Sequence, residues 1–247
     1  MAINFSAILI FGHLLIVLGT FSLDSSAQEV TDWILKKEAD EIKVYTRRHG
    51  NSPYLEFKGE VIIDAPFVSV LALLDDVEAC EEWVHRCKMG KTLAEVRTPD
   101  EYDRVIYQIT QLPFPLKNRD AIYKATVTWG KDNQSAYIQL MSMPDYIEGT
   151  DFVRIRESSG SYEAIMLNKS QVKLTWMHWV DPEGILPAFI VNSLSVSIPF
   201  QSLKRFREKV KEEKYQGLTL NLNTDDKVLG FHSTVDGETE PPRSEPP

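Results

Sequence analysis

LPFPLKNRD at residues 112–120 and KLTWMHWVDPEGILPAFIVN at residues 173–192 are the two stretches that decide the fold. The first is a proline-rich loop that runs into Asn-Arg-Asp, and the second begins as a strand and passes through Gly-Ile-Leu-Pro into a helix. Around them, short alternating segments separated by Gly, Asn, Asp or Ser predict an antiparallel sheet. One face of such a sheet must be covered, and the long helical segment at 187–214 is the element available to cover it. The sequence therefore predicts a single α+β domain.

In this order the two motifs resemble the START family of lipid-binding domains, and the likeness extends over residues 32–216. The resemblance implies a helix-grip fold, in which a curved antiparallel β-sheet wraps around a long C-terminal helix and encloses a hydrophobic cavity. It also implies binding and transport of a lipid or another hydrophobic or amphipathic small molecule. Pro199 lies inside the C-terminal helix, as in the bacterial branch that this sequence resembles, and it predicts a kink or a restart there.

The two ends of the chain differ from the part between them. Residues 1–27 carry an apolar run followed by Ser25 and Ala27, a pattern typical of a secretory signal peptide cleaved after Ala27. An uncleaved N-terminal membrane anchor is the alternative. We therefore expect a secreted or periplasmic protein with its lipid-binding domain at 28–217. Residues 218–247 are acidic and proline-rich, which predicts a disordered tail.

Hydrophobic periodicity predicts the remaining elements. We expect helices at 31–39, 66–76 and 79–84, and strands at 41–48, 55–63, 91–96, 103–110, 121–129, 136–141, 152–156, 162–167 and 172–181.

Cys80 and Cys87 would meet an oxidising compartment after secretion. Seven residues of unbroken helix span about 10 Å, which exceeds the Cα separation of a disulfide. A disulfide therefore requires the helix to break at 83–86, and two separate, partly buried thiols are the alternative. His85 lies between the cysteines, but three residues without a fourth ligand do not predict a zinc site.

Charge and motifs exclude several classes of function. A net charge of −9 gives the chain no overall attraction to nucleic acid. The sequence contains no nucleophile elbow, metalloprotease motif, phosphate-binding glycine loop or dinucleotide fingerprint, so we expect no cofactor. The interpretation is a monomeric, non-enzymatic carrier. The alternative is a hydrolase or cyclase-like enzyme that acts on a hydrophobic substrate in the same cavity, with acid-base chemistry from the polar residues around it.

The alternation of side chains along a strand predicts which residues face the covered side of the sheet. It places Arg119 and Tyr123 inward, together with Trp176 and His178 on the last strand and Val105, Tyr107 and Ile109 on the strand before the proline loop. Small inward residues would leave space for a cavity; these are Gly59, Ala121, Ala125 and Ala136. The predicted ligand-binding residues are Arg119, Tyr107, Tyr123, Trp83, Trp176, His178, Phe189 and Asn192.

Arg119 corresponds to the arginine that, in the family this sequence resembles, looks into the lipid pocket. The sequence offers this guanidinium no obvious inward carboxylate, and an unpaired buried charge is costly. One hypothesis is that the partner is the carboxylate or phosphate of an amphipathic lipid. The alternative is that Arg119 pairs with Asp120 or binds backbone groups of the loop. For His178 two interpretations likewise remain: a ligand contact or pH switch, and a hydrogen-bonded core histidine.

The proline loop and the C-terminal helix are the candidates for transient membrane contact. Phe114 and Leu116 would either be exposed for that contact or pack under the helix. The first half of the helix, 186–198, is expected to roof the cavity, whereas the second half is expected to lie on the surface with Leu203, Phe206 and Val210 as an apolar stripe.

Overall fold

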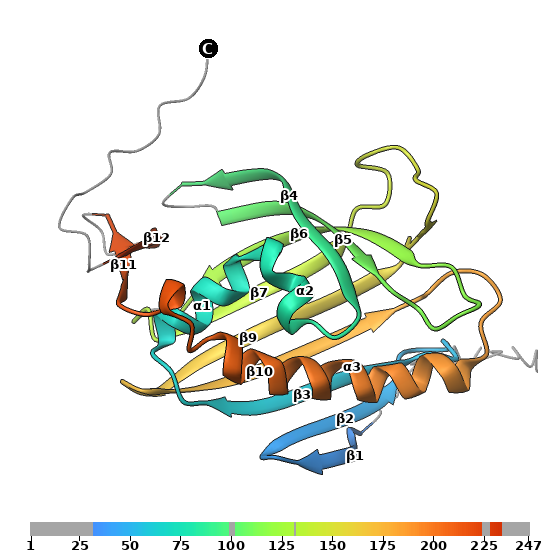
Figure 1. Ribbon diagram of the computed structural model, residues 1–247, viewed down its shortest axis with the longest axis horizontal. Helices are drawn as coiled ribbons and strands as arrows, with labels where there is room; N and C mark the ends of the chain where they lie inside the picture. Colours follow the sequence, from blue (N-terminus) through green and yellow to red (C-terminus); the bar gives the residue numbers. More distant parts are fainter. Residues whose placement is uncertain (1–31, 99–101, 131, 224–227, 234–247) are drawn as a thin grey trace, which may run out of the picture. The chain divides into compact units, whose positions relative to one another are not determined.

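The computed structural model describes residues 32–98, 102–130, 132–223 and 228–233. Its largest feature is a ten-stranded sheet with the order β1-β2-β3-β10-β9-β7-β6-β5-β4, in which β8 also pairs with β6 (Figure 1). The pairings along this order are antiparallel, as predicted, and β8 runs parallel to β6. The strands are β1 (Ile34–Ala39), β2 (Ile42–Arg48), β3 (Leu55–Ile63), β4 (Cys87–Arg97), β5 (Tyr102–Thr110), β6 (Arg119–Trp129), β7 (Ser135–Ser142), β8 (Val153–Arg154), β9 (Ser158–Asn168) and β10 (Gln171–Val180).

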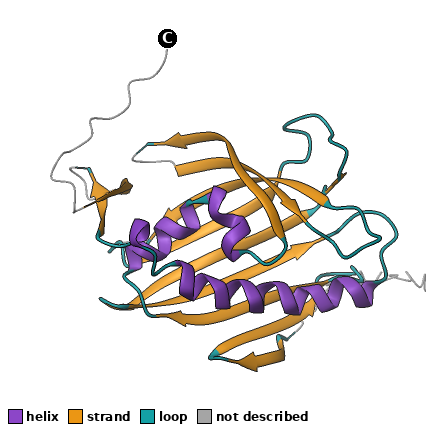
Figure 2. Ribbon diagram, in the orientation of Figure 1, coloured by secondary structure: helices purple, strands orange, loops and turns teal. Residues whose placement is uncertain are grey.

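Helices cover one side of this sheet, so the helix-grip fold is confirmed (Figure 2). They are α1 (Phe67–Asp75), α2 (Cys80–Trp83) and α3 (Ala188–Lys209), with short 3₁₀ turns at Val77–Ala79 and Glu213–Tyr215. Buried residues of all three helices form one core with β2, β3 and β10. A small separate hairpin, β11 (Leu218–Leu222) and β12 (Val228–Ser233), follows α3.

The second half of α3 is the part most deeply packed. Leu203 and Phe206, with Val210 directly after the helix, form the predicted apolar stripe and are completely buried, whereas Lys204, Arg205 and Glu208 are exposed on the surface. Gly59 of β3 explains how close the helix comes: a Cβ at that position would lie 2.8 Å from Leu203 Cδ1 and 3.3 Å from Pro199 Cβ. The space expected at Gly59 is therefore filled by the helix itself.

Pro199 does not interrupt the helix, so the predicted restart is not observed, while a kink at this position stays a prediction. α3 is one continuous helix of 22 residues that includes Pro199, and Pro199 is buried. A proline in a helix interior removes one backbone hydrogen bond. Burial of apolar side chains from both halves of α3 offsets that loss.

Residues 34–39 form strand β1, and the predicted helix at 31–39 was wrong for these residues. β1 pairs with β2 through a two-residue turn at Asp40 and Glu41, whose φ angles are 52° and 59°. Two successive positive φ values are the geometry of a type I′ hairpin turn. Pairing with the edge of the sheet outweighed the weak helical pattern.

The predicted disordered tail needs a similar correction. Residues 218–222 and 228–233 pair as an antiparallel hairpin, with Leu220 opposite Phe231. Residues 234–247 lie outside the described residues, as do residues 1–31 with the predicted signal peptide.

The segment from 67 to 87 follows the prediction closely. α1 and the short α2 form where expected, and α2 ends at Trp83. Arg86 then adopts a φ of 71°, and the chain turns back so that the Cα atoms of Cys80 and Cys87 are 5.9 Å apart. The two cysteines form a disulfide, which was one of the two predicted alternatives. It joins α2 to the start of β4.

Within the described part of the chain, none of the helices combines the length and the apolar composition that a membrane crossing requires.

Candidate ligand cavity

Two adjacent cavities lie between the sheet and the helices. The first, here called the α3 compartment, has a volume of about 130 Å³ and is bounded by the first half of α3, the proline loop and the middle of the sheet. The second, the α1 compartment, has a volume of about 90 Å³ and is bounded by α1, α2 and strands β5 to β7. They share the lining residues Val84, Gln108, Tyr123, Trp176 and His178. The two compartments therefore have these five residues as a common boundary.

Strand β6 contributes to the cavity as its alternation predicts. Ala121 and Tyr123 line the α3 compartment, and Tyr123 and Ala125 line the α1 compartment. The two alanines leave space in front of the sheet, as expected. Ala136, by contrast, packs in the main core and lines neither compartment.

Strand β5 presents the opposite face from the one predicted. Ile106 and Gln108 line the cavity, whereas Tyr107 and Ile109 form a small cluster with Ile122 on the other side of the sheet. Partly buried Met143, Phe152, Leu93 and Val105 pack against that cluster. The prediction of Tyr107 as a ligand contact was therefore wrong, because the sheet buries apolar residues on both faces here. Gln108 was missed for the same reason.

Behind this cluster, Asp120 forms a buried polar centre away from the cavity. Its Oδ2 accepts hydrogen bonds from Arg154 Nη2 at 2.9 Å, Thr150 Oγ1 at 2.8 Å and Tyr107 Oη at 3.3 Å. Burial acts to raise the pKa of Asp120, but these hydrogen bonds and the charge of Arg154 hold it below its usual value. Asp120 thus fixes the 143–157 segment to the sheet and leaves Arg119, its neighbour in sequence, without a carboxylate.

Arg119 lines the α3 compartment, as predicted, and its side chain is held by backbone oxygens. Nε donates to Pro182 O at 2.8 Å, Nη1 to Lys117 O at 2.5 Å and Nη2 to Glu183 O at 3.0 Å. Backbone contact, one of the predicted alternatives, is therefore present. Among the described residues no carboxylate forms an ion pair with Arg119. A guanidinium has five N–H donors, so two remain for another acceptor.

His178 lies where the two compartments meet, between aromatic side chains. Its Nε2 is 2.8 Å from Ser158 Oγ, which in turn donates to Trp179 O at 2.9 Å. The Ser158 proton is thus engaged, and Nε2–H of His178 must be the donor to Oγ. Nδ1 is buried and has no partner within the described structure. Burial lowers the pKa of His178 to about 4, so the ring is neutral at physiological pH.

Aromatic rings form the wall on either side of His178. Tyr123 meets the imidazole edge to face at a centroid distance of 5.7 Å, and Trp176 meets it at 6.5 Å. Trp83 of α2 lines the α1 compartment and packs against Trp176 at 6.4 Å. The indole N–H groups of Trp83 and Trp176 are buried and have no acceptor in the described residues. The cavity wall is therefore largely apolar, with two indole donors that have no acceptor among the described residues.

Two predicted contacts lie away from the cavity. Phe189 is 75% exposed, on the outer side of α3. Asn192 accepts a hydrogen bond from the backbone N–H of Leu55 at 2.9 Å and donates to Pro53 O at 3.2 Å. It fastens α3 to the start of β3 and lines neither compartment. The helix residues that do line the α3 compartment are Ile190, Val191, Leu194, Ser195 and Ile198, and they confirm that the first half of α3 is its roof.

In the proline loop, one of the two predicted alternatives holds for Phe114 and the other for Leu116. Phe114 is 96% exposed, while Leu116 lines the α3 compartment. Ile185, in the loop before α3, is also fully exposed. Hydrogen bonds from Arg119 to Pro182 and Glu183 hold these two loops together, and Figure 1 shows them side by side at the N-terminal end of α3.

Comparison with known proteins decides the family. The family model described as "START domain" matches residues 22–215 of the chain. The chain belongs to the START family.

Relatives of this START domain include bacterial and animal proteins. An uncharacterized protein of Pseudomonas aeruginosa is 26% identical over 182 residues, which cover 73% of this chain and 88% of the relative. The phosphatidylcholine transfer protein of Rattus norvegicus is 24% identical over 175 residues, covering 69% of this chain and 79% of the relative.

Solved structures agree with this assignment. A fragment of the STAR-related lipid transfer protein from Xanthomonas axonopodis is 29% identical, with a TM-score of 0.66, and covers 73% of this chain and 99% of that one. Human STARD10 is 22% identical, with a TM-score of 0.64 and coverage of 74% of both chains. The second likeness confirms the fold.

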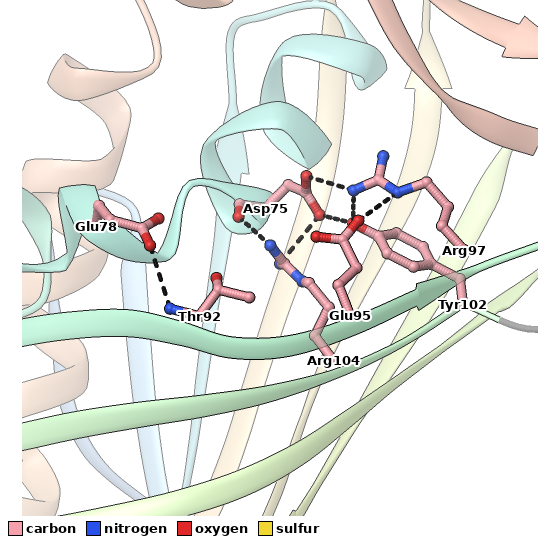
Figure 3. A network of polar contacts seen from close by, with 7 residues as sticks. All are labelled: Asp75, Glu78, Thr92, Glu95, Arg97, Tyr102 and Arg104. Atoms are coloured by element: carbon pink, nitrogen blue, oxygen red, sulfur yellow. Dashed lines mark hydrogen bonds and ion pairs between the residues drawn. The ribbon is translucent and has the colours of Figure 1, made fainter. Parts of the chain in front are cut away.

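The α1 compartment of this START domain is bordered by a network of charged side chains at the end of α1 (Figure 3). Asp75 receives hydrogen bonds from Tyr102 Oη and from Arg97 Nη2, the latter at 3.3 Å, and pairs with Arg104 Nη2 at 3.0 Å. Arg97 also donates to Glu95 at 2.6 Å. Burial lowers the pKa of Arg97, but the nearby Tyr102, Asp75 and Glu95 outweigh that effect and raise it. This network joins α1 to β4 and β5.

Among the described residues, no group of three or more His, Cys, Asp or Glu side chains is placed to hold a metal ion.

Proposed function

We propose that this START domain binds one amphipathic lipid with its anionic group at Arg119 and carries it in the cavity without altering it chemically. The observation that carries this proposal is Arg119 itself. It is 6% exposed and its described partners are three neutral carbonyl oxygens. A buried cation without a counter-ion is costly, and a carboxylate or phosphate with two oxygens matches its remaining donors.

The dimensions of the cavity favour a slender ligand. The compartments of about 90 Å³ and about 130 Å³ are each smaller than the roughly 300–1,000 Å³ typical of drug-sized ligand sites. A single hydrocarbon chain that uses both compartments fits this better than a lipid with two chains. Its burial would supply about 0.8 kcal/mol for each methylene group, less the cost of association.

Exposed apolar side chains around Arg119 support transfer at a membrane. Phe114 and Ile185 lie on the two loops that Arg119 joins, and Phe189 lies on the first turn of α3. In this proposal they touch a bilayer transiently while the lipid enters or leaves. Leu116, which was the other predicted contact, serves the cavity wall instead.

The place of action in this proposal is the periplasm or the extracellular space. The predicted signal peptide at 1–27 and the Cys80–Cys87 disulfide support it, since disulfides persist in oxidising compartments. The mass of the mature protein from its native host tests this part: a chain that begins at Gln28 is expected.

The central test is binding of palmitate and of hexadecanol, which share a chain and differ in charge, to the wild type and to Arg119→Met. Hydrogen bonds to charged groups contribute about 1.5–3 kcal/mol, so palmitate affinity should fall by about tenfold to a hundredfold while hexadecanol affinity is retained. Arg156→Met, which removes an exposed arginine, is the control. Equal losses for both ligands would show that Arg119 only supports the loop.

The hydrolase or cyclase-like alternative predicts a different result in the same preparation. Lipids recovered after long incubation would then carry a changed mass. A carrier returns them unchanged.

A further inference from the structure

One residue that lines the α1 compartment comes from outside the START match. Phe231 of β12 lines the α1 compartment, together with Leu71 and Leu74 of α1 and Trp129 of β6. The family model ends at residue 215, and Phe231 comes from the hairpin that follows it. Its ring is partly buried against the main core.

Several contacts seat this hairpin on the domain. Just before it, Tyr215 Oη donates to Asp76 Oδ2 at 2.7 Å, and Lys214 Nζ binds the same atom at 2.9 Å. Within it, Val228 is 6% exposed. α1 contacts β11 and the 3₁₀ turn that precedes it.

Gly230 shows how closely β12 approaches the charged network in Figure 3. Its φ is +148°, which favours glycine, and a Cβ there would lie 2.7 Å from Arg97 Nη1. Arg97 is itself held by Asp75, Tyr102 and Glu95 (Figure 3). The charged network at the end of α1 therefore also contacts β12 at Gly230. This contact positions Phe231, the residue after Gly230.

We propose that Phe231 is the end wall of the cavity and sets the length of hydrocarbon chain that the protein accepts. This inference rests on the proposed function, in which the anionic group lies at Arg119. Arg119 lines only the α3 compartment and Phe231 only the α1 compartment, while Tyr123, Trp176 and His178 line both. In this proposal a hydrocarbon chain with its head group at Arg119 passes the shared residues and has its far end at Phe231. The ligand class is therefore a single-chain amphiphile of limited length.

Each methylene that finds room is worth about 0.8 kcal/mol, or about a fourfold change in affinity. Phe231→Ala removes the ring at the end wall, so the chain length that binds most tightly should increase by two or more carbons. Phe231→Trp should move it to shorter chains. Leu222→Ala is the matched control, because Leu222 belongs to the same hairpin, is 41% exposed and lines neither compartment.

The experiment measures affinities for saturated fatty acids from decanoate to docosanoate and for the primary alcohols of the same lengths. It uses the full mature chain, and a thermal melt checks that each variant is folded. Opposite shifts for the two Phe231 variants, with no shift for Leu222→Ala, are expected. If Phe231→Ala fails to fold, Phe231→Leu replaces it and a smaller shift in the same direction is expected.

Two failures are distinguishable. If fatty acids bind in an Arg119-dependent way but the chain length that binds most tightly is the same in the Phe231 variants as in the wild type, the end-wall inference is overturned and the proposed function stands. If alcohols bind as well as acids and the optimum follows Phe231, the anionic headgroup is wrong and the end wall stands. Binding of neither series to the wild type would overturn both.

Discussion

Protonation of His178 should make this domain measurably less stable between neutral and mildly acidic pH. The imidazole lies among Phe57, Tyr123 and Trp176, and burial lowers its pKa to about 4. In the unfolded chain the pKa of a histidine is about 6.5. The unfolded state therefore takes up the proton first, and acid favours unfolding.

The sign and size follow from this difference in pKa. Above about pH 6.5 His178 is neutral in both the folded and the unfolded state and does not lower the stability. As the pH falls from there toward 4, only the unfolded state takes up the proton, so the unfolding free energy decreases progressively. Between pH 7 and pH 5 the loss is about 2 kcal/mol of unfolding free energy. His85, whose pKa is also lowered by burial and by Arg205 and Arg86, adds a loss of the same sign.

The assay is urea unfolding at both pH values for the wild type, His178→Phe and Phe57→Leu. The His178 variant should lose about 2 kcal/mol less than the wild type on acidification. Phe57→Leu removes a neighbouring ring but no titrating group, so its loss on acidification should match that of the wild type. If His178→Phe and the wild type respond equally to pH, the imidazole is not buried neutral and the reasoning fails.

Two further predictions concern stability. Asp120→Asn should lower the unfolding free energy by about 3–5 kcal/mol in chemical denaturation, because Arg154 is left buried without its counter-ion; Asp145→Asn, which removes an exposed partner of Arg156, should change it little, and equal effects would contradict this account. Replacing both Cys80 and Cys87 by Ala should lower it by about 2.5 kcal/mol, from the entropy of a short closed loop. Reducing agent should destabilise the wild type similarly and leave the double variant unchanged; a wild type insensitive to reductant would argue against the disulfide.

Much of the fold could be predicted because local pattern and tertiary packing agree. The strands of the sheet alternate as half-buried strands do, and α1 begins after Pro66 as expected. β1 could not be predicted, since it gains its stability from pairing with β2 and not from its own pattern. The hairpin after residue 217 was missed because its few apolar residues are ordered by the surface of α1, which the local sequence does not reveal.

Part of the candidate site was predicted by the alternation of side chains along a strand. Tyr123, Trp176 and His178 follow this rule. Tyr107 breaks it because the 143–157 segment buries the opposite face of β5, and alternation cannot say which of two buried faces holds a cavity. Phe231 lies more than fifty residues beyond the rest of the compartment wall, and no local signal connects it to the site.

The two halves of α3 differ in what supports them, and this gives the helix a direction of opening. Its C-terminal half is anchored by side chains that are completely buried, whereas its N-terminal half roofs the α3 compartment. Removing the roof exposes little packed core, so the free energy of local opening is lowest there. Amide hydrogens at 189–198 should accordingly exchange by local fluctuation, and those at 203–209 only when the whole domain unfolds. We therefore expect α3 to stay packed against Gly59 at Pro199 and Leu203 and to move away from the sheet at its N-terminal end. That end lies beside Arg119, where the head group of the ligand would be in the proposed function.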